Sequence, residues 1–416
     1  MDNLLSKIPP MYTGQKLEEK LTCLPEYDPD ICNADAGTRL IALNDLSEIY
    51  IPSHMSYEIY SKIYLAMLHS LNKKQTVDSI RQGNENHRRM QGVKYNSILG
   101  GSDSFSIIGK SGIGKSTAIA KAIEIAGGME VITLQNPYAN IIPFVNIQCP
   151  HDCSIKGLLL SILGQVDMTI GTNYRDAAVR AKASIDVLIG MVSQVALNHI
   201  LLIVVDECQN ICRNKNGVNL VSAMTQLINS SGISICLVGL PETEILFQKE
   251  MHLARRSIGL SYLDTFCDDY FIHFCEILCS YQYVAKPQPI TPEIIGTLYQ
   301  CSNGVIGLVV SLIMEAQQMA ILSGKEMLSK DIILDAFHTR MKNLQSFVVS
   351  EPTKLNQTAT IQRESFVMEQ SEQKQDAADS RRGATIKELV KQSKEENADI
   401  IELLKASDIK IMEVDL

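Results

Sequence analysis

The first strong pattern of apolar and polar residues along the chain is helical. From residue 55 to residue 71, "MSYEIYSKIYLAMLHSL" repeats apolar residues at helical spacing. The next stretch, "NKKQTVDSIRQGNENHRRM", is polar and leans basic, which is typical of a connector. We therefore expect residues 1–98 to form a mostly helical N-terminal extension.

Short apolar runs then begin to alternate with helical ones. Strand-like runs start at residues 105, 129, 143, 200 and 232, as "FSIIG", "MEVITL", "PFVNIQC", "ILLIVVD" and "GISICLVG". Continuous apolar strands separated by helices indicate a parallel sheet that is covered on both faces. The pattern predicts an α/β fold with its core over residues 99–256.

Beyond about Arg256 the strands stop and the pattern predicts helices. Thr291 precedes Pro292, and Ser329 precedes "KDIILDAF", both of which are typical helix starts. We expect a helical lid over residues 257–349. Residues 350–383 are rich in Gln, Ser, Glu and Asp and favour a disordered linker, whereas 384–416 regains apolar periodicity.

Composition narrows the class of protein. The net charge of −9 argues against a coat of positive potential, so any nucleic-acid contact must come from a local patch. The 11 cysteines form no CxxC pair and the start lacks the pattern of a signal peptide, so we expect a cytoplasmic protein without structural zinc. The charge-free stretch 187–205 is interpreted as a helix end followed by a buried strand, and no membrane span is predicted.

The stretch "SIIGKSGIGKST" carries the clearest chemistry. It contains GxxxxGKS between the strand "FSII" and the helix "STAIAKAIEIA", where backbone N–H groups and a helix N-terminus can hold phosphates. Lys115 would reach the β and γ phosphates and Ser116 would bind Mg²⁺. The predicted nucleotide-binding residues of this loop are Gly109, Ser111, Gly112, Gly114, Lys115, Ser116 and Thr117.

A second element predicts hydrolysis. The apolar strand in "HILLIVVDECQN" ends in Asp206, which would hold Mg²⁺ with Ser116, and Glu207, which would polarise the attacking water. The alternative is that both are surface cap residues. ATP is favoured over GTP because "NKNG" lacks the aspartate of a guanine-reading NKxD motif.

A pair of arginines follows in "MHLARRSIG". In oligomeric ATPases an arginine from this region enters the neighbouring subunit's site and neutralises transition-state charge. We therefore expect Arg255 or Arg256 to act in catalysis across a subunit interface. An ordinary solvated basic pair is the alternative.

Together these features resemble the layout of AAA+ ATPases, and more narrowly the TnsC branch of bacterial transposition regulators, which is related to TniB. The narrower resemblance runs from about residue 39 to the terminus, with 350–382 unassigned. It is carried by "LNDLSEIYIPS", "IQCPHDCSIKGLLLSILGQVDMTIGTNY", "CSNGVIGLVVSLIMEAQQMAILSGKEMLS" and "IIELLKASDIKIMEVDL". Leu240 stands where many AAA+ proteins place a polar sensor, and "SNGVIGLV" lacks a sensor arginine.

The resemblance implies an ATP-dependent oligomer, a ring or a filament, that surrounds target DNA and links a target-selection protein to the transposase. The missing sensor residues, in contrast, predict slow, partner-regulated hydrolysis. The selector would be a CRISPR complex or a site-specific DNA-binding protein. The segment 384–416 would dock on the transposase, or alternatively pack back on the lid.

Apart from the resemblance, the residues that support DNA contact lie mainly in one short segment. Cations and hydroxyls gather around "GTNYRDAAVRAK", and such groups would contact phosphates irrespective of sequence. A solvated helix face is the alternative. The candidate DNA-binding residues are Lys156, Thr172, Arg175, Arg180 and Lys182.

Two other functions compete with this interpretation. A signalling or scaffold NTPase would oligomerise equally well without DNA. A replication-initiator-like ATPase would usually carry a DNA-reading domain at its C-terminus, where this chain has only a linker and a short segment. A small-molecule kinase is disfavoured because it needs neither the acid pair nor the paired arginines.

Overall fold

The computed structural model describes residues 7–74, 76–99, 104–128, 130–135, 138–244 and 259–348, which belong to one compact unit, Met1–Val348. The predicted linker and C-terminal segment lie outside the described residues. The predicted boundaries between extension, core and lid stay predictions.

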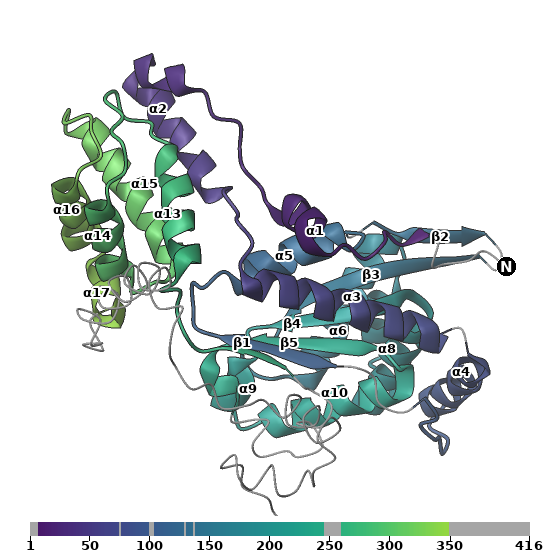
Figure 1. The fold of residues 1–416 in the computed structure, drawn as a ribbon. Helices are drawn as coiled ribbons and strands as arrows, with labels where there is room; N and C mark the ends of the chain where they lie inside the picture. Colours follow the sequence, from purple (N-terminus) through teal and green to yellow (C-terminus); the bar gives the residue numbers. More distant parts are fainter. Residues whose placement is uncertain are drawn as a thin grey trace, which may run out of the picture. The chain divides into compact units, whose positions relative to one another are not determined.

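The centre of this unit is a six-stranded sheet with the strand order β2-β3-β4-β5-β1-β6 (Figure 1). All neighbouring strands run parallel except β2, which pairs with β3 in antiparallel fashion. The strands are β1 Phe105–Gly109, β2 Ile132–Gln135, β3 Tyr138–Gln148, β4 Ile200–Asp206, β5 Ser234–Gly239 and β6 Leu260–Tyr262. The predicted α/β class with a parallel sheet is confirmed.

Helices cover both faces of the sheet (Figure 1). Side chains alternate along β4, so Leu202 and Val204 join the apolar cluster with α1, α3 and α5, whereas Ile203 and Val205 join the cluster with α6, α8 and α10. This double burial explains the uninterrupted apolar run of the strand. These helices are α1 Gly14–Leu21, α3 His54–Lys74, α5 Lys115–Ile125, α6 Ile155–Ile170, α8 Ile185–His199 and α10 Gly217–Ser231, with the short α7 Tyr174–Arg180 and α9 Gln209–Arg213.

A third apolar cluster joins the helices between residues 269 and 344, in the region of the predicted lid, which we call the lid from here on. It also contains residues from the short helix η3, Leu43–Ser47, and from the segment after it, so part of the N-terminal region packs with the lid. Thr291 and Ser329 cap lid helices as predicted, each accepting a bond from a backbone N–H of the first turn. The remaining elements are η2 Pro29–Asn33, α2 Ala36–Ala42, η4 Pro241–Thr243, α13 Asp269–Ser280, α14 Pro292–Ser302, α15 Ile306–Leu322, α16 Lys330–Arg340 and α17 Lys342–Val348.

The predicted polar connector after residue 71 is wrong, because it contains the helix α4, Val77–Met90. Its buried face is polar. Gln82 bonds Asn86, and Asn86 donates in turn to the Ser230 carbonyl. Arg89, 3% exposed, bonds the Asp186 and Gln226 side chains. The buried face of α4 consists of polar side chains that form hydrogen bonds with residues far away in the sequence. The helix therefore shows no apolar periodicity.

Two strand predictions also need correction. Strands do not stop at Arg256, since β6 pairs with β1 at the edge of the sheet. The run near residue 129 belongs to an antiparallel hairpin rather than to a parallel crossover. Among the described helices, none alone is long and apolar enough to cross a membrane; α14 and α15 reach that limit only together, across a bend of 117°.

Candidate nucleotide site

The phosphate loop connects β1 to α5, as the sequence predicts. β1 is fully buried, and α5 begins at Lys115 directly after Gly114. Gly112 and Gly114 have φ values of 78° and 94°, which residues with a Cβ rarely adopt. A Cβ at Gly109 would lie 2.8 Å from the Tyr262 carbonyl oxygen of β6. The glycines therefore permit both the tight loop and its close contact with the edge strand.

Lys115 is held inside this loop. Its Nζ donates to the carbonyl oxygens of Gly109 and Lys110, each at 2.7 Å, and the residue is 8% exposed. Burial lowers the pKa of Lys115, while Asp206 and Glu207 oppose the shift. The ammonium is thus fixed beside the loop, close to the acid pair.

The acid pair lies across from the start of α5. Asp206 ends β4, and its Oδ2 lies 3.5 Å from the Ser116 hydroxyl oxygen. The Glu207 backbone N–H donates to Asp206 Oδ1 at 2.7 Å. Glu207 itself has a φ of 60°, in the left-handed region. The structure therefore brings together Ser116 and Asp206, the two residues predicted to hold Mg²⁺.

Gln209 is a site residue that the sequence analysis missed. Its Nε2 donates to Glu207 Oε2, and its Oε1 accepts from the Leu240 backbone N–H at 3.4 Å. It is 6% exposed and lines the cavity described next. Its place two residues after Glu207 in "DECQN" was the available signal.

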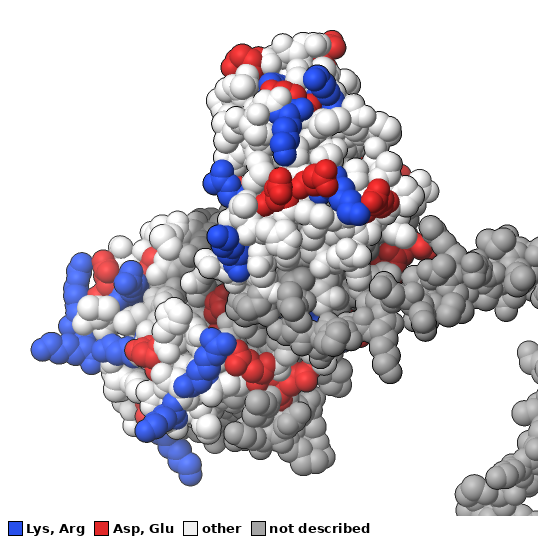
Figure 2. Space-filling view, turned by 90° about the vertical axis from the view of Figure 1, so that its left-hand side faces the viewer, with Lys and Arg blue, Asp and Glu red and all other residues white. Residues whose placement is uncertain are grey.

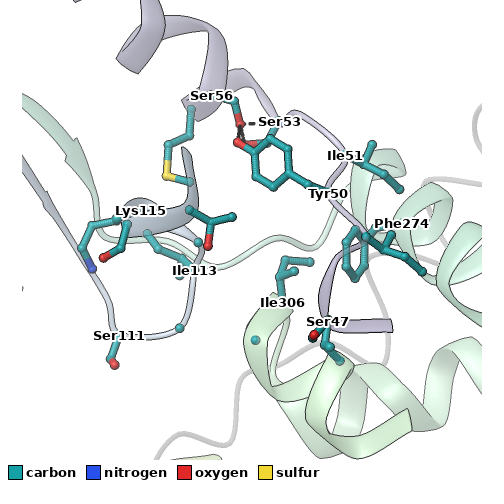
Figure 3. Close-up of a pocket in the computed structure, with 18 of the residues that line it drawn as sticks. Ser47, Tyr50, Ile51, Ser53, Ser56, Ser111, Ile113, Lys115, Phe274 and Ile306 are labelled. Carbon is teal, nitrogen blue, oxygen red and sulfur yellow. Dashed lines mark hydrogen bonds between the residues drawn. The ribbon is translucent and has the colours of Figure 1, made fainter. Parts of the chain in front are cut away.

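The loop and the acid pair open into a cavity of about 400 Å³, within the range of small-molecule sites. The predicted loop residues Ser111, Gly112, Gly114, Lys115, Ser116 and Thr117 line one part of it, together with Asp206 and Glu207. The opposite wall is mainly apolar and comes from distant segments, with Tyr50, Ile51, Phe274 and Ile306 among its residues (Figure 3).

The sequence analysis did not assign these apolar residues to the site. The stretch "LNDLSEIYIPS" was noted in the sequence only because it resembles the TnsC family. In the structure this stretch supplies a wall of the cavity, where the Tyr50 hydroxyl donates to Ser56 Oγ at 2.7 Å (Figure 3). Burial raises the pKa of Tyr50 to about 12, so the phenol stays neutral.

The lid touches the phosphate loop directly. The Gly307 backbone N–H, in the first turn of α15, donates to the Gly112 carbonyl oxygen at 2.9 Å. A Cβ at Gly307 would lie 3.0 Å from that oxygen. Lid and loop are therefore close enough for one nucleotide to contact both.

Four of the five candidate DNA-binding residues lie close together in the sequence around α7, and the fifth, Lys156, lies apart from them. Arg175, Arg180 and Lys182 are exposed on or just after α7, and Thr172 lies shortly before it. Lys156 lies in the first turn of α6, and the 16 residues of that helix span about 24 Å. The structure therefore places Lys156 at the other end of α6 from the group.

Asp167 organises the turn that leads into α7. Its carboxylate accepts from the Thr172 hydroxyl at 2.6 Å and from the backbone N–H of Tyr174 and of Arg175, each at 2.8 Å. The Thr172 hydroxyl is thus already bonded within the protein. Arg255 and Arg256, like residues 384–416, lie outside the described residues.

Comparison with known families gives one match. Residues 61–259 match the family described as bacterial TniB protein, which confirms the expected TnsC/TniB-type resemblance. Among curated proteins, none matches the chain.

The chain is also similar to several solved structures. The ORC1 protein of Aeropyrum pernix in complex with DNA is 13% identical, covers 79% of this chain and 82% of its own, and has a TM-score of 0.40. The ADP form of the A. pernix ORC2 protein is 15% identical and covers 63% and 67%, with a TM-score of 0.40. The Thermotoga maritima RuvB Holliday junction branch migration motor is 14% identical and covers 62% and 67%, with a TM-score of 0.34.

Proposed function

We propose that this protein, whose residues 61–259 match the bacterial TniB family, is an ATP-hydrolysing AAA+ regulator of DNA transposition. It would assemble on target DNA and link a target-selection protein to the transposase. One observation supports the nucleotide-binding part of this proposal. The phosphate loop, which includes Ser116, and the acid pair Asp206 and Glu207 line the same cavity.

The cavity suits a nucleoside triphosphate. Backbone N–H groups of the loop and the N-terminus of α5 would bind the phosphates, and Lys115 would leave its carbonyl partners for the β and γ phosphates. The apolar wall with Tyr50 and Phe274 would cover the base. The oxygens of Ser116 and Asp206, 3.5 Å apart, fit a hard cation such as Mg²⁺, which would neutralise phosphate charge.

Hydrolysis would use Glu207 as the group that orients and deprotonates water. The water oxygen bonds the γ phosphorus, its proton passes to the Glu207 carboxylate, and the bond from the γ phosphorus to the bridging oxygen breaks to release ADP. Lys115 is the one cation among the described residues that line the cavity. We assign the additional transition-state cation to Arg255 or Arg256 of a neighbouring copy.

DNA contact would be local and electrostatic. On the face drawn in Figure 2, lysine and arginine side chains gather along the lower left edge with acidic side chains between them, and both signs also mix across the upper part. The exposed group Arg175, Arg180 and Lys182 offers further cations around α7. Phosphate contacts of this kind are independent of sequence and weaken with rising salt.

Contacts with transposition proteins are assigned to the ends of the chain. The segment 384–416 would fold onto the transposase, and residues 1–98 would contribute contacts to a partner or to DNA. Deleting 384–416 is expected to spare ATPase activity and DNA assembly but to abolish transposase recruitment in a pull-down with the cognate transposase. Unchanged recruitment would eliminate this part of the proposal.

Two substitutions test the nucleotide site. Lys115→Ala should abolish ATP binding and ATP-dependent assembly, because it removes the cation for the β and γ phosphates. Glu207→Gln should keep ATP binding but stop turnover, so that assemblies persist on DNA after free ATP is removed. Lys121→Ala, an exchange of a partly exposed lysine paired with Glu124 on α5, is the matched control. Rapid release from DNA by the Glu207→Gln variant would contradict the role of Glu207.

A further inference from the structure

We infer that Gln209 is a positioning residue for ATP hydrolysis, whose side-chain amide fixes the Glu207 carboxylate at the cavity wall and ties it to the end of β5. The inference rests on the proposed role of Glu207 as the water-activating group. It adds a residue that neither the sequence pattern nor the family match assigns.

Both polar atoms of the Gln209 side chain are engaged. Nε2 donates to Glu207 Oε2, and Oε1 accepts from the Leu240 backbone N–H at 3.4 Å. The amide therefore forms a bridge from the residue after β4 to the residue after β5. Because Gln209 is 6% exposed, solvent competes little for these bonds.

The backbone of Glu207 explains why its side chain needs a partner. Its φ of 60° is uncommon for a residue with a long side chain, and such conformations persist where surrounding contacts hold them. The neighbouring backbone is fixed, since Cys208 N–H donates to the Val238 carbonyl at 2.9 Å. These backbone contacts do not fix the side-chain torsions of Glu207. The hydrogen bond from the Gln209 amide restricts them.

The bridge from Gln209 also explains how the site can have an apolar residue, Leu240, directly after β5. Leu240 stands where a polar sensor side chain is common in AAA+ proteins, and its side chain cannot bond a phosphate or water. Gln209 brings an amide to this place from α9 and contacts Leu240 through the backbone. One N–H of Gln209 Nε2 has no partner among the described residues and remains to donate to the γ phosphate or the attacking water.

In the reaction, Gln209 would transfer no proton. Its N–H would hold the Glu207 carboxylate so that the free lone pair of that group faces the water beside the γ phosphorus. A displacement of about 1 Å in such a group lowers rates by about 100-fold. Gln209 therefore acts on turnover and leaves nucleotide binding to the loop.

Two variants of the full-length protein test this role, with kcat, KM and the dissociation constant of Mg·ATP measured with and without duplex DNA. Gln209→Leu keeps the size of the side chain and removes both bonds. It should lower kcat by about 10- to 100-fold and change the dissociation constant by less than about threefold. Asn210→Leu is the control on the same helix, because the Asn210 amide bonds the Cys149 carbonyl and not Glu207; its kcat should stay within about threefold of wild type.

Gln209→Glu gives a second readout that a purely structural residue would not move. It keeps the length and polarity of the side chain but replaces the N–H donor with a carboxylate, which accepts only and repels the Glu207 carboxylate. Its kcat should fall by about 10-fold or more, while the dissociation constant of Mg·ATP stays within about threefold of wild type. A wild-type kcat for Gln209→Glu or for Gln209→Leu would overturn the inference.

The outcomes also separate this inference from the proposed function. If Glu207→Gln turns over ATP like the wild type, the role of Glu207 fails and the inference fails with it. If Glu207→Gln is inactive while both Gln209 variants behave like the wild type, the proposed function stands and only the inference falls. Melting temperatures of all variants, measured in parallel, show whether each is folded.

Discussion

A largely buried ion pair joins α2, which precedes the cavity-wall segment 47–56, to Glu326 of the lid. Arg39, 4% exposed, donates to both carboxylate oxygens of Glu326 at 2.6 and 2.8 Å and to the Tyr283 carbonyl oxygen at 3.1 Å. We predict that Arg39→Met destabilises the protein, because it removes the guanidinium and leaves the carboxylate in place.

The size of the effect follows from the burial of the pair. Removing one partner of a buried ion pair costs about 3 to 5 kcal/mol. The side chains of Arg39 and Glu326 are 5% and 19% exposed, and the carboxylate keeps a bond from the Ala285 N–H. We therefore expect a loss of about 3 kcal/mol in the free energy of unfolding, at the lower end of that range. For the unit Met1–Val348, with an unfolding entropy of about 2.1 cal/mol/K per residue, the melting temperature should fall by about 4 °C.

The assay is thermal unfolding of the full chain at pH 7, with Lys330→Met as the control. Lys330 and Glu293 also form an ion pair in the lid, at 2.7 Å, but their side chains are 47% and 66% exposed. Exposed pairs contribute little, so the control should change the melting temperature by no more than about 1 °C. Equal effects of the two substitutions would refute the reasoning.

Acid should weaken the same ion pair. The hydrogen bonds from Arg39 lower the pKa of Glu326 to about 2, well below its ordinary value of 4.5. A carboxyl whose pKa is depressed in the folded state stabilises the protein above the unfolded pKa and loses that contribution as pH falls through the folded value. The difference in melting temperature between wild type and Arg39→Met should therefore shrink from pH 7 to pH 3.5. A difference that grows with acid would contradict the assignment.

Two further predictions concern ligands. Gly112→Ala should weaken ATP binding by about tenfold or more, as measured by fluorescence titration, because its φ is 78° and a Cβ would lie 2.8 Å from Val305 Cγ1 of the lid; unchanged affinity would show that the loop tolerates a side chain there. Replacing Arg180 and Lys182 together by Ala should reduce the slope of log DNA affinity against log salt by about 2, since each lost phosphate contact contributes about 0.9; an unchanged slope would exclude both residues from DNA contact.

Local chemistry made the nucleotide loop and the acid pair predictable from sequence. The loop needs Gly112 and Gly114 for its backbone and Lys115 for charge, and Asp206 and Glu207 end an apolar strand, so each signal lies within a dozen residues. Tyr50 and Phe274, on the opposite wall, are more than 200 residues apart and meet only in the folded chain.

Other features could not be predicted from the sequence, either because polar contacts stabilise them or because the element is very short. In α4, the inner residues Gln82 and Asn86 are both 0% exposed, yet they give no apolar signal because their partners are amides and carbonyls. The strand β6 has only 3 residues and is defined by its pairing with β1. Gln209 was missed because its role depends on Leu240, which lies 31 residues further along the chain.

The central claim is that ATP in this cavity holds copies of the protein together around a double helix. The most direct measurement is sedimentation velocity of the purified full chain with duplex DNA, with Mg²⁺ and a slowly hydrolysed ATP analogue added or omitted. The account predicts large assemblies only when nucleotide and duplex are both present, and their loss in the Lys115→Ala variant. Single molecules at saturating nucleotide and duplex, or equal assembly without DNA, would contradict it.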